Sequence, residues 1–456
     1  MISNFFLLLC FYLPFQIALN PAQGVDLASL RIFILILFSV WVYDRIKNKP
    51  PHQLNKNKID DLSNIDEQEQ FDKKERNWFS WCGGKKNIFI FDVQTKLILF
   101  FLFLSFISLF FAQNYFWSVR KLAYLFSIFP LYFITKDILN SKEKVIKTLA
   151  SLVWAGAIVA IIGIVQFFSQ FIWNYEEIFK VYLSFIGPVF WGENLTQMVR
   201  NYPSWLVGVS GQNYFRAIGT FPDPHSFSLF LGMILPISVI LFFISKNKII
   251  GGLSFVTIFL ANILTFARGG YLAIIAGITI FILVFWNKTQ TKHKIMASLA
   301  VIFLFLMLTI PGPVSQRFDS SFDLQEGSNA GRISIWQKSL ETIKHKPLFG
   351  TGIGNFSLAV DGKIDYRNPI YAHNTYLDIA VEQGILASLV WIFILLVTLW
   401  NFWILAKEDM IYAGIFTSVI IFSAHSMVET GLYSPIVLSL LLMLFGLTRF
   451  SHYEKE

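Results

Sequence analysis

Residues 328–384 read SNAGRISIWQKSLETIKHKPLFGTGIGNFSLAVDGKIDYRNPIYAHNTYLDIAVEQG, and they separate two apolar runs, 295–310 and 385–405. Apolar runs of about 20 residues are typical of membrane-spanning helices. The connection between the two runs contains helix-forming and turn-forming sequence of its own, and connections of this length are rarely without a function. The stretch therefore predicts a membrane protein with a structured segment outside the bilayer.

The composition of the whole chain supports this prediction. Apolar residues make up 55% of the 456 residues, whereas charged residues make up 14%. A soluble domain carries about 25% charged residues, so this chain could not cover a globular surface. The net charge of +8 is spread over segments that flank the apolar runs, which indicates membrane orientation rather than a nucleic-acid partner. Cys10 and Cys82 predict no disulfide framework.

About twelve apolar stretches are long enough to cross a bilayer as helices. They are residues 4–19, 27–43, 93–112, 118–135, 146–171, 226–244, 249–266, 270–286, 295–310, 385–405, 411–427 and 435–448. No run shows the alternating pattern of a barrel strand. The sequence therefore predicts an all-α polytopic membrane protein with a long helical loop between spans 9 and 10.

The charges around these stretches predict the orientation. The first stretch is similar to a signal peptide but has neither a basic flank nor a clear cleavage site, so we expect a retained helix. With a cytoplasmic N-terminus, the Lys-rich segments KDILNSKEK, SKNK and NKTQTKHK lie inside, and the short outer loops NPAQGVD and VETGLYS contain no Lys or Arg. This distribution follows the positive-inside rule and predicts that both termini are cytoplasmic.

This topology divides the chain into five segments. They are N-terminal transmembrane helices (1–43), a polar cytoplasmic insert (44–92), a transmembrane core (93–310) with an outer loop (172–225), an extracytoplasmic loop (311–384), and C-terminal helices with a short cytoplasmic tail (385–456). The insert has few aliphatic residues, so we expect a flexible linker. Docking of the insert to a cytoplasmic partner is the alternative.

The outer side collects the side chains of chemical interest, which are Arg216, Arg268, Arg332 and His373. Arg268 lies in LTFARGGYL, a short turn between two spans. It either snorkels to fix the depth of a helix end or binds phosphate, because a guanidinium can donate two parallel hydrogen bonds to phosphate oxygens. The adjacent Gly269 and Gly270 would let the backbone approach an anion closely.

Arg216 precedes FPDPHS, where two prolines interrupt any helix before the next span. We expect Asp223 or Ser226 to cap that span and His225 to be part of the cap. Arg216 itself either pairs with Asp223 or binds an anionic substrate.

Residues 332–345 predict an amphipathic helix that ends before Pro347. Its apolar stripe comprises Ile333, Trp336, Leu340 and Ile343. The helix either lies in the membrane interface or packs against the rest of the outer loop. GTGIGNF does not have the spacing of a dinucleotide fingerprint and no strand precedes it, so its glycines predict turns.

His373 is followed by Asn374 and opens an apolar helix in a solvent-facing loop. Imidazole is the side chain best suited to accept a proton near neutral pH, although a lone histidine is more often structural. The acidic residues of this side, among them Glu326, are scattered, with no paired-carboxylate or His-cluster spacing. The sequence therefore predicts neither a metal nor a cofactor.

Four stretches carry a resemblance to a known family. They are RAIGTFPDPHSFSLFLGMILP, LTFARGGYLAIIAG, GRISIWQKSLETIKHKPLFGTGIGNF and AHNTYLDIAVEQGIL, which together span residues 216–386. At these residues the chain resembles the O-antigen ligase and polymerase superfamily of bacterial membrane glycosyltransferases. Two positions depart from the family pattern: Ala267 replaces the usual Ser before Arg268, and His225 replaces the usual Asn of DPN.

The resemblance implies a GT-C-like enzyme of the bacterial inner membrane whose site opens to the periplasm or exterior. Such an enzyme moves a glycan from an undecaprenyl diphosphate carrier to an acceptor hydroxyl, with inversion and without a metal. By this resemblance Arg216 and Arg268 bind the carrier diphosphate and His373 is the base. Arg332 and Trp336 match the supporting RxxxW pattern, and Asn374 accompanies the histidine.

The resemblance leaves several functions open. Ligases, polymerases and protein O-oligosaccharyltransferases share these residues, and the acceptor could be a glycan, a lipid or a protein. A transporter of lipid-linked glycans is an alternative from another class, and it would show internal repeats and broken helices at mid-membrane. A scaffold that recruits partners through the insert is a third.

Overall fold

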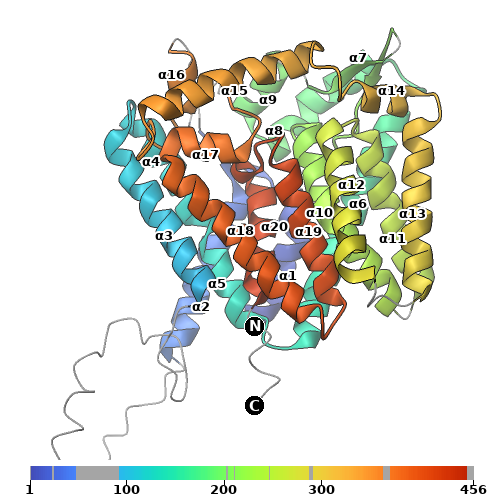
Figure 1. The fold of residues 1–456 in the computed structure, drawn as a ribbon, viewed down its shortest axis with the longest axis horizontal. Helices are drawn as coiled ribbons and strands as arrows, with labels where there is room; N and C mark the ends of the chain where they lie inside the picture. Colours follow the sequence, from blue (N-terminus) through green and yellow to red (C-terminus); the bar gives the residue numbers. More distant parts are fainter. Residues whose placement is uncertain are drawn as a thin grey trace, which may run out of the picture.

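The computed structural model describes residues 2–22, 25–47, 92–201, 204–209, 211–245, 247–286, 291–362 and 370–448. The central part of the predicted insert, including Cys82, and the tail from Arg449 lie outside the described residues. The described residues form a bundle of long helices, and shorter elements cover one end of the bundle (Figure 1).

Each apolar stretch expected from the sequence forms a helix over most of its length. The bundle helices are α1 (Ile2–Tyr12), α2 (Ser29–Lys47), α3 (Val93–Ser108), α4 (Tyr115–Ile128), α5 (Pro130–Ile138), α6 (Lys142–Ser169), α10 (Pro224–Ile244), α11 (Lys248–Leu264), α12 (Arg268–Phe285), α13 (Thr291–Thr309), α18 (Ile385–Leu405), α19 (Ile411–His425) and α20 (Pro435–Gly446). The fourth stretch is divided into α4 and α5, because Pro130 has no backbone N–H and begins a new helix.

Among the described residues, five helices are long and apolar enough to cross a membrane by length and composition. They are Val93–Phe111, Lys142–Ser169, Pro224–Ile244, Arg268–Phe285 and Ile385–Leu405. Shorter apolar helices accompany them at Ile2–Phe15, Lys248–Leu264, Ile411–His425 and Pro435–Gly446. This is an all-α multi-pass membrane protein, while the full number of spans and their orientation stay predictions.

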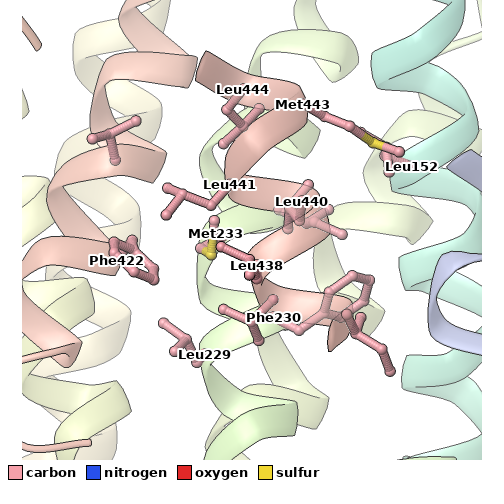
Figure 2. Packing of buried hydrophobic residues seen from close by; sticks show 14 of the residues in the cluster. Leu152, Leu229, Phe230, Met233, Phe422, Leu438, Leu440, Leu441, Met443 and Leu444 are labelled. Carbon is pink, nitrogen blue, oxygen red and sulfur yellow. The ribbon is translucent and has the colours of Figure 1, made fainter. Parts of the chain in front are cut away.

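The core of the bundle surrounds α20, in which every residue from Ile436 to Gly446 is buried. A helix that is apolar on all sides needs neighbours all round. Figure 2 shows Phe230 and Met233 of α10 beside Leu438 of α20. This packed core positions the helix ends that carry the loops at one end of the bundle.

Two glycines set the distance between α12 and its neighbours. A Cβ atom at Gly270 would overlap Oγ of Ser228 on α10, and one at Gly269 would lie 2.7 Å from Cγ2 of Val428. Side chains of other elements thus fill the space beside both glycines. Both glycines therefore allow close packing of α12 against its neighbours, and the approach of their backbone to an anion stays a prediction.

The remaining helices gather at one end of the bundle. They are α7 (Tyr175–Val181), a π-helical turn (Tyr182–Ile186), α8 (Gly187–Phe190), α9 (Glu193–Asn201), α14 (Pro313–Asp319), α15 (Gly327–His345), α16 (Phe356–Val360) and α17 (Thr375–Gln383). α15 crosses this end and lies above α17 in Figure 1. It ends before Pro347, as predicted, but begins five residues earlier than Arg332, where Glu326 caps it.

The structure also contains two antiparallel β-hairpins, which the predicted all-α fold did not include. β1 (Ala18–Ala22) pairs with β2 (Val25–Ala28), and β3 (Leu206–Val209) pairs with β4 (Gln212–Phe215). Both hairpins lie in loops. The first is fixed to α9, because Asp26 accepts hydrogen bonds from the side chain of Asn194 and the backbone N–H of Leu195.

The loop 311–384 is held to the bundle at its glycine-rich stretch. Gly350, Gly352 and Gly354 have φ angles of 67°, 91° and 81°, a region that favours glycine, so these residues form turns as predicted. Asn355 then donates a hydrogen bond of 2.8 Å to Oγ of Ser118 on α4.

Ser357 of α16 is hydrogen-bonded to Ile370, a residue close to His373 in the chain. Its hydroxyl donates to the carbonyl of Ile370 (3.0 Å) and accepts from the N–H of the same residue (2.8 Å). Ser357 and Ile370 are therefore held side by side.

Candidate active site

His373 forms a pair with a glutamate that the sequence did not single out. Nδ1 of His373 lies 3.0 Å from Oε1 of Glu429, in the connection that follows α19. The imidazole side chain is 42% exposed, whereas the carboxylate is 13% exposed. When Nδ1–H donates to this carboxylate, Nε2 keeps its lone pair and can accept a proton.

The pair also shifts the protonation of both groups. The negative charge of Glu429 raises the pKa of His373 above its ordinary value, and burial opposes this only in part. Burial alone would raise the pKa of Glu429, but the neighbouring His373 and Arg332 help hold it well below its usual range. Glu429 therefore stays ionised and makes the imidazole a stronger base.

His373 has a strained backbone, with a φ angle of 49°. Non-glycine residues rarely adopt this region, and such strain tends to occur at functional sites. Hydrogen bonds made by the residues just before and just after His373 hold this conformation. The N–H of Ala372 donates to Oδ1 of Asp378 (2.8 Å), and the Asn374 side chain caps α17 by accepting from the N–H groups of Tyr376 and Leu377.

Asp378 connects the loop that carries His373 with the loop that carries Glu429. Its Oδ1 accepts from Ala372, next to His373, and its Oδ2 accepts from the hydroxyl of Thr430, next to Glu429. Burial raises the pKa of Asp378 to about 7. One buried carboxyl group thus sets the distance between imidazole and glutamate.

The supporting residues of α15 reach the same pair. Nη2 of Arg332 lies 3.7 Å from Oε2 of Glu429, and the indole N–H of Trp336 donates to the carbonyl of Ala372 (2.7 Å). Residues four apart lie on one face of a helix, which explains the RxxxW spacing. The packing alternative for this helix is confirmed, because Trp336 and Ile343 pack against a cluster that contains Phe356. Leu340, expected on the apolar stripe, is exposed instead.

The second part of the site is a group of guanidiniums around the turn between α11 and α12. Nε of Arg216 donates to the carbonyl of Thr265 (2.6 Å), and Nε of Arg317 donates to that of Phe266 (3.5 Å). Arg268 begins α12 two residues later. Consecutive carbonyls are only a few ångströms apart, so three arginines converge on this turn. We call Arg216, Arg268 and Arg317 the arginine cluster.

Arg216 is buried and does not form the expected pair with Asp223. Its Nη1 donates to the carbonyl of Ser204 (3.0 Å), and its Nη2 has no hydrogen-bond partner among the described residues. Asp223 instead caps α10, accepting from the N–H groups of His225 and Ser226. A buried donor without a partner is uncommon and calls for an explanation.

Arg268 does not snorkel to solvent. Its side chain is 6% exposed, Nη1 donates to the carbonyl of Ser320 (2.8 Å), and Nη2 lies 3.0 Å from Oε2 of Glu326. Glu326 also lies 3.9 Å from Nη1 of Arg317. The carboxylate of Glu326 therefore forms ion pairs with two arginines, Arg268 and Arg317.

Arg216 and Arg317 stay charged at neutral pH. Burial, together with the nearby Arg317, lowers the pKa of Arg216 to about 9. Burial and repulsion by Arg268 lower the pKa of Arg317 to about 10. The cluster is thus an excess of positive charge that only Glu326 neutralises by a close ion pair among the described residues.

The two parts of the site lie at the same end of the bundle. Glu429 interacts electrostatically with both Arg216 and Arg332, and Nδ1 of His225 lies 3.6 Å from its Oε2. His225 therefore lies close to Glu429 as well as in the first turn of α10, where the sequence suggested only a helix cap. No group of three or more His, Cys, Asp or Glu residues in the described ranges is arranged to hold a metal ion.

The sequence missed Glu429 and Arg317. Glu429 was visible as the lone charge in the short outer loop VETGLYS, and Arg317 as a further arginine of the loop 311–384. Neither position could be linked to His373 or Arg268 without the fold.

Comparison with known proteins gives two matches. Residues 253–392 match the family model described as O-antigen ligase, a range that contains Arg268, Arg317, Arg332 and His373. The chain is also 25% identical over 353 residues to the ComP-specific O-oligosaccharyltransferase of Acinetobacter baylyi (strain ATCC 33305 / BD413 / ADP1). The aligned residues cover 73% of this chain and 57% of that protein. The chain thus spans little more than half the length of this relative. The motifs and these matches together make the chain similar to proteins of the O-antigen ligase superfamily.

Proposed function

We propose that this protein is a glycosyltransferase that moves a glycan from an undecaprenyl diphosphate carrier to an acceptor hydroxyl. The observation that carries the proposal is the His373–Glu429 pair beside the arginine cluster. A base and a group of cations at the same end of the bundle are what acceptor deprotonation and diphosphate departure require. The O-antigen ligase match supports the same class of reaction.

The reaction begins at the acceptor. Nε2 of His373 accepts the proton of the acceptor hydroxyl while its oxygen attacks C1 of the donor sugar, and Glu429 stabilises the imidazolium that forms. The bond between C1 and the phosphate oxygen breaks, and its electron pair leaves with the diphosphate. Attack from the face opposite the leaving group inverts the configuration at C1.

The arginine cluster acts on the leaving group. The unpartnered Nη2 of Arg216 and the fork of Arg268 are donors for diphosphate oxygens, and hydrogen bonds between charged groups contribute about 1.5–3 kcal/mol each. Charge accumulates on the diphosphate as the bond to C1 breaks, so these contacts favour the transition state.

The setting follows from the same proposal. The protein lies in the bacterial inner membrane, and the end that carries α15 and α17 faces the periplasm or exterior. The charged groups of the site gather at that end rather than at mid-membrane, which favours a transferase over a transporter of lipid-linked glycans.

A second candidate concerns the acceptor. The relative from Acinetobacter baylyi is named as an O-oligosaccharyltransferase specific for ComP, which favours a protein hydroxyl as acceptor here. Transfer to a lipid or to another lipid-linked glycan, as in ligases and polymerases, uses the same base and the same cations.

The test is the His373→Ala variant in membranes supplied with a lipid-linked glycan donor. We expect glycan transfer to be abolished while the protein level is unchanged. His345→Ala is the matched control, because His345 is exposed at the end of α15 and its loss should leave transfer intact. Undiminished transfer by His373→Ala would show that this residue is not the base.

A further inference from the structure

Glu326 occupies a complete anion-binding site. Its Oε2 accepts hydrogen bonds from Nη2 of Arg268 (3.0 Å) and from the backbone N–H groups of Ser328 and Asn329 (3.1 Å each). Its Oε1 faces Nη1 of Arg317 at 3.9 Å. The carboxylate therefore has one N–H group of the Arg268 guanidinium, the nearby Arg317 guanidinium and two amides at the start of a 19-residue helix around it.

These ligands are also the ones that a phosphate group takes in proteins. Arginine forks and the N–H groups of a helix N-terminus bind phosphate oxygens, whereas a single carboxylate leaves part of this capacity unused. Around the turn, Arg216, Arg268 and Arg317 provide three positive charges, and Glu326 provides the one carboxylate in close contact with them among the described residues. A diphosphate, with a negative charge on each phosphate, balances the cluster better.

The Glu326 side chain is also accessible, being 29% exposed, whereas Arg268 beneath it is 6% exposed. An incoming anion can thus reach Glu326 from solvent, and displacing it exposes the arginines. Capping of α15 does not depend on the charge, because an uncharged N-cap residue can accept the same N–H groups.

We propose that Glu326 is an internal counter-ion that the diphosphate of the donor displaces, and that Arg317 is a third guanidinium of the donor site. This inference rests on the proposed function. In this view, the Glu326 carboxylate is an anion that competes with the donor diphosphate, and this competition sets the affinity for the donor. Glu326 caps the helix that carries Arg332, so α15 connects the proposed counter-ion to the arginine that contacts Glu429.

The test uses the purified full-length chain and measures binding of inorganic pyrophosphate by calorimetry. Glu326→Asn removes the charge but keeps a good N-cap, so we expect pyrophosphate to bind about tenfold more tightly. Glu326→Asp keeps the charge and should bind like the wild type. Glu341→Asn, an exposed position on the same helix, should also leave binding unchanged.

Arg317→Ala should weaken pyrophosphate binding about tenfold, and its melting temperature is measured to show that the fold is kept. Unchanged or weaker binding by Glu326→Asn would overturn the role of Glu326. Wild-type binding by a folded Arg317→Ala protein would overturn the role of Arg317.

A transfer assay on the same preparations separates this inference from the proposed function. If the wild type transfers glycan but Glu326→Asn does not bind pyrophosphate more tightly, the counter-ion idea fails alone. If the expected binding changes occur but the wild type cannot transfer a lipid-linked glycan, the proposed function fails and the anion site stands.

Discussion

Arg332 and Trp336 leave α15 one helical turn apart, and each holds one half of the His373–Glu429 pair. The guanidinium lies 3.7 Å from the Glu429 carboxylate, and the indole donates to the carbonyl of Ala372, next to His373. α15 therefore fixes the geometry of the proposed base through two separate contacts.

Glu429→Gln should lower the rate of transfer by about 10²–10⁴-fold, because the amide cannot stabilise the imidazolium. The KM for the donor should change little, since the donor diphosphate is assigned to the arginine cluster. Initial rates in membranes at matched protein levels measure the effect. Glu408→Gln, at an exposed position beyond α18, is the control. A variant as fast as wild type would show that Glu429 does not assist His373.

The pH dependence tests the same pair with a different readout. His373 must be neutral to accept a proton, so transfer should rise with pH through an apparent pKa above 6.5, because Glu429 raises the pKa of His373. In Glu429→Gln that charge is lost, the pKa falls, and the rise should occur at lower pH. Rates measured between acidic and alkaline pH in both proteins decide this, and identical profiles would contradict it.

Trp336→Phe should keep the packing of the ring but lose the hydrogen bond to Ala372. We expect a loss of about 1 kcal/mol in the free energy of unfolding. We also expect transfer to fall by up to about 100-fold, because His373 is less well placed. Thermal unfolding and initial rates measure the two effects. A variant with reduced stability but normal transfer would indicate that the indole has no positioning role.

Arg268→Lys should raise the KM for the donor by about tenfold, since an ammonium group cannot reproduce the fork that contacts Ser320 and Glu326. The KM is obtained with a lipid-linked glycan at varied concentration. Arg200→Lys, at an exposed position on α9, should leave it unchanged. Full activity of Arg268→Lys would argue against a bidentate contact with the diphosphate.

Gly270→Ala should destabilise the protein by about 1–3 kcal/mol, the usual cost of overpacking, because the new Cβ overlaps Oγ of Ser228. The second substitution Ser228→Ala removes that oxygen, so the double variant should recover part of the loss. Melting temperatures of the single and double variants in detergent measure this. Equal destabilisation in both would place the steric conflict elsewhere.

Most of the fold was predictable from the sequence because hydrophobic length and helix breakers are local signals. The apolar stretches became helices, Pro347 followed the end of α15, and the glycines of 350–356 formed turns. The division at Phe129 and Pro130 was missed, although the proline was visible. The hairpins were missed because short strands in loops depend on contacts such as that of Asp26 with α9.

The site was predictable only in part. The sequence indicated that Arg216, Arg268, Arg332 and His373 share one side, since all four occur in or near outer loops. It could not assign their partners, because Glu429 is 56 residues from His373 and Glu326 is 58 from Arg268. Such pairings follow from tertiary packing, which spacing along a helix does not encode.

Ser357 fixes the backbone three residues before the imidazole, because its hydroxyl bonds to both backbone groups of Ile370. On the other side, the side chain of Asn374 bonds to the first turn of α17. His373 thus lies in a short stretch that is tied at both ends, and a group held in this way needs little rearrangement when a substrate arrives. The proposed base is therefore preorganised by hydrogen bonds that never touch the ring itself.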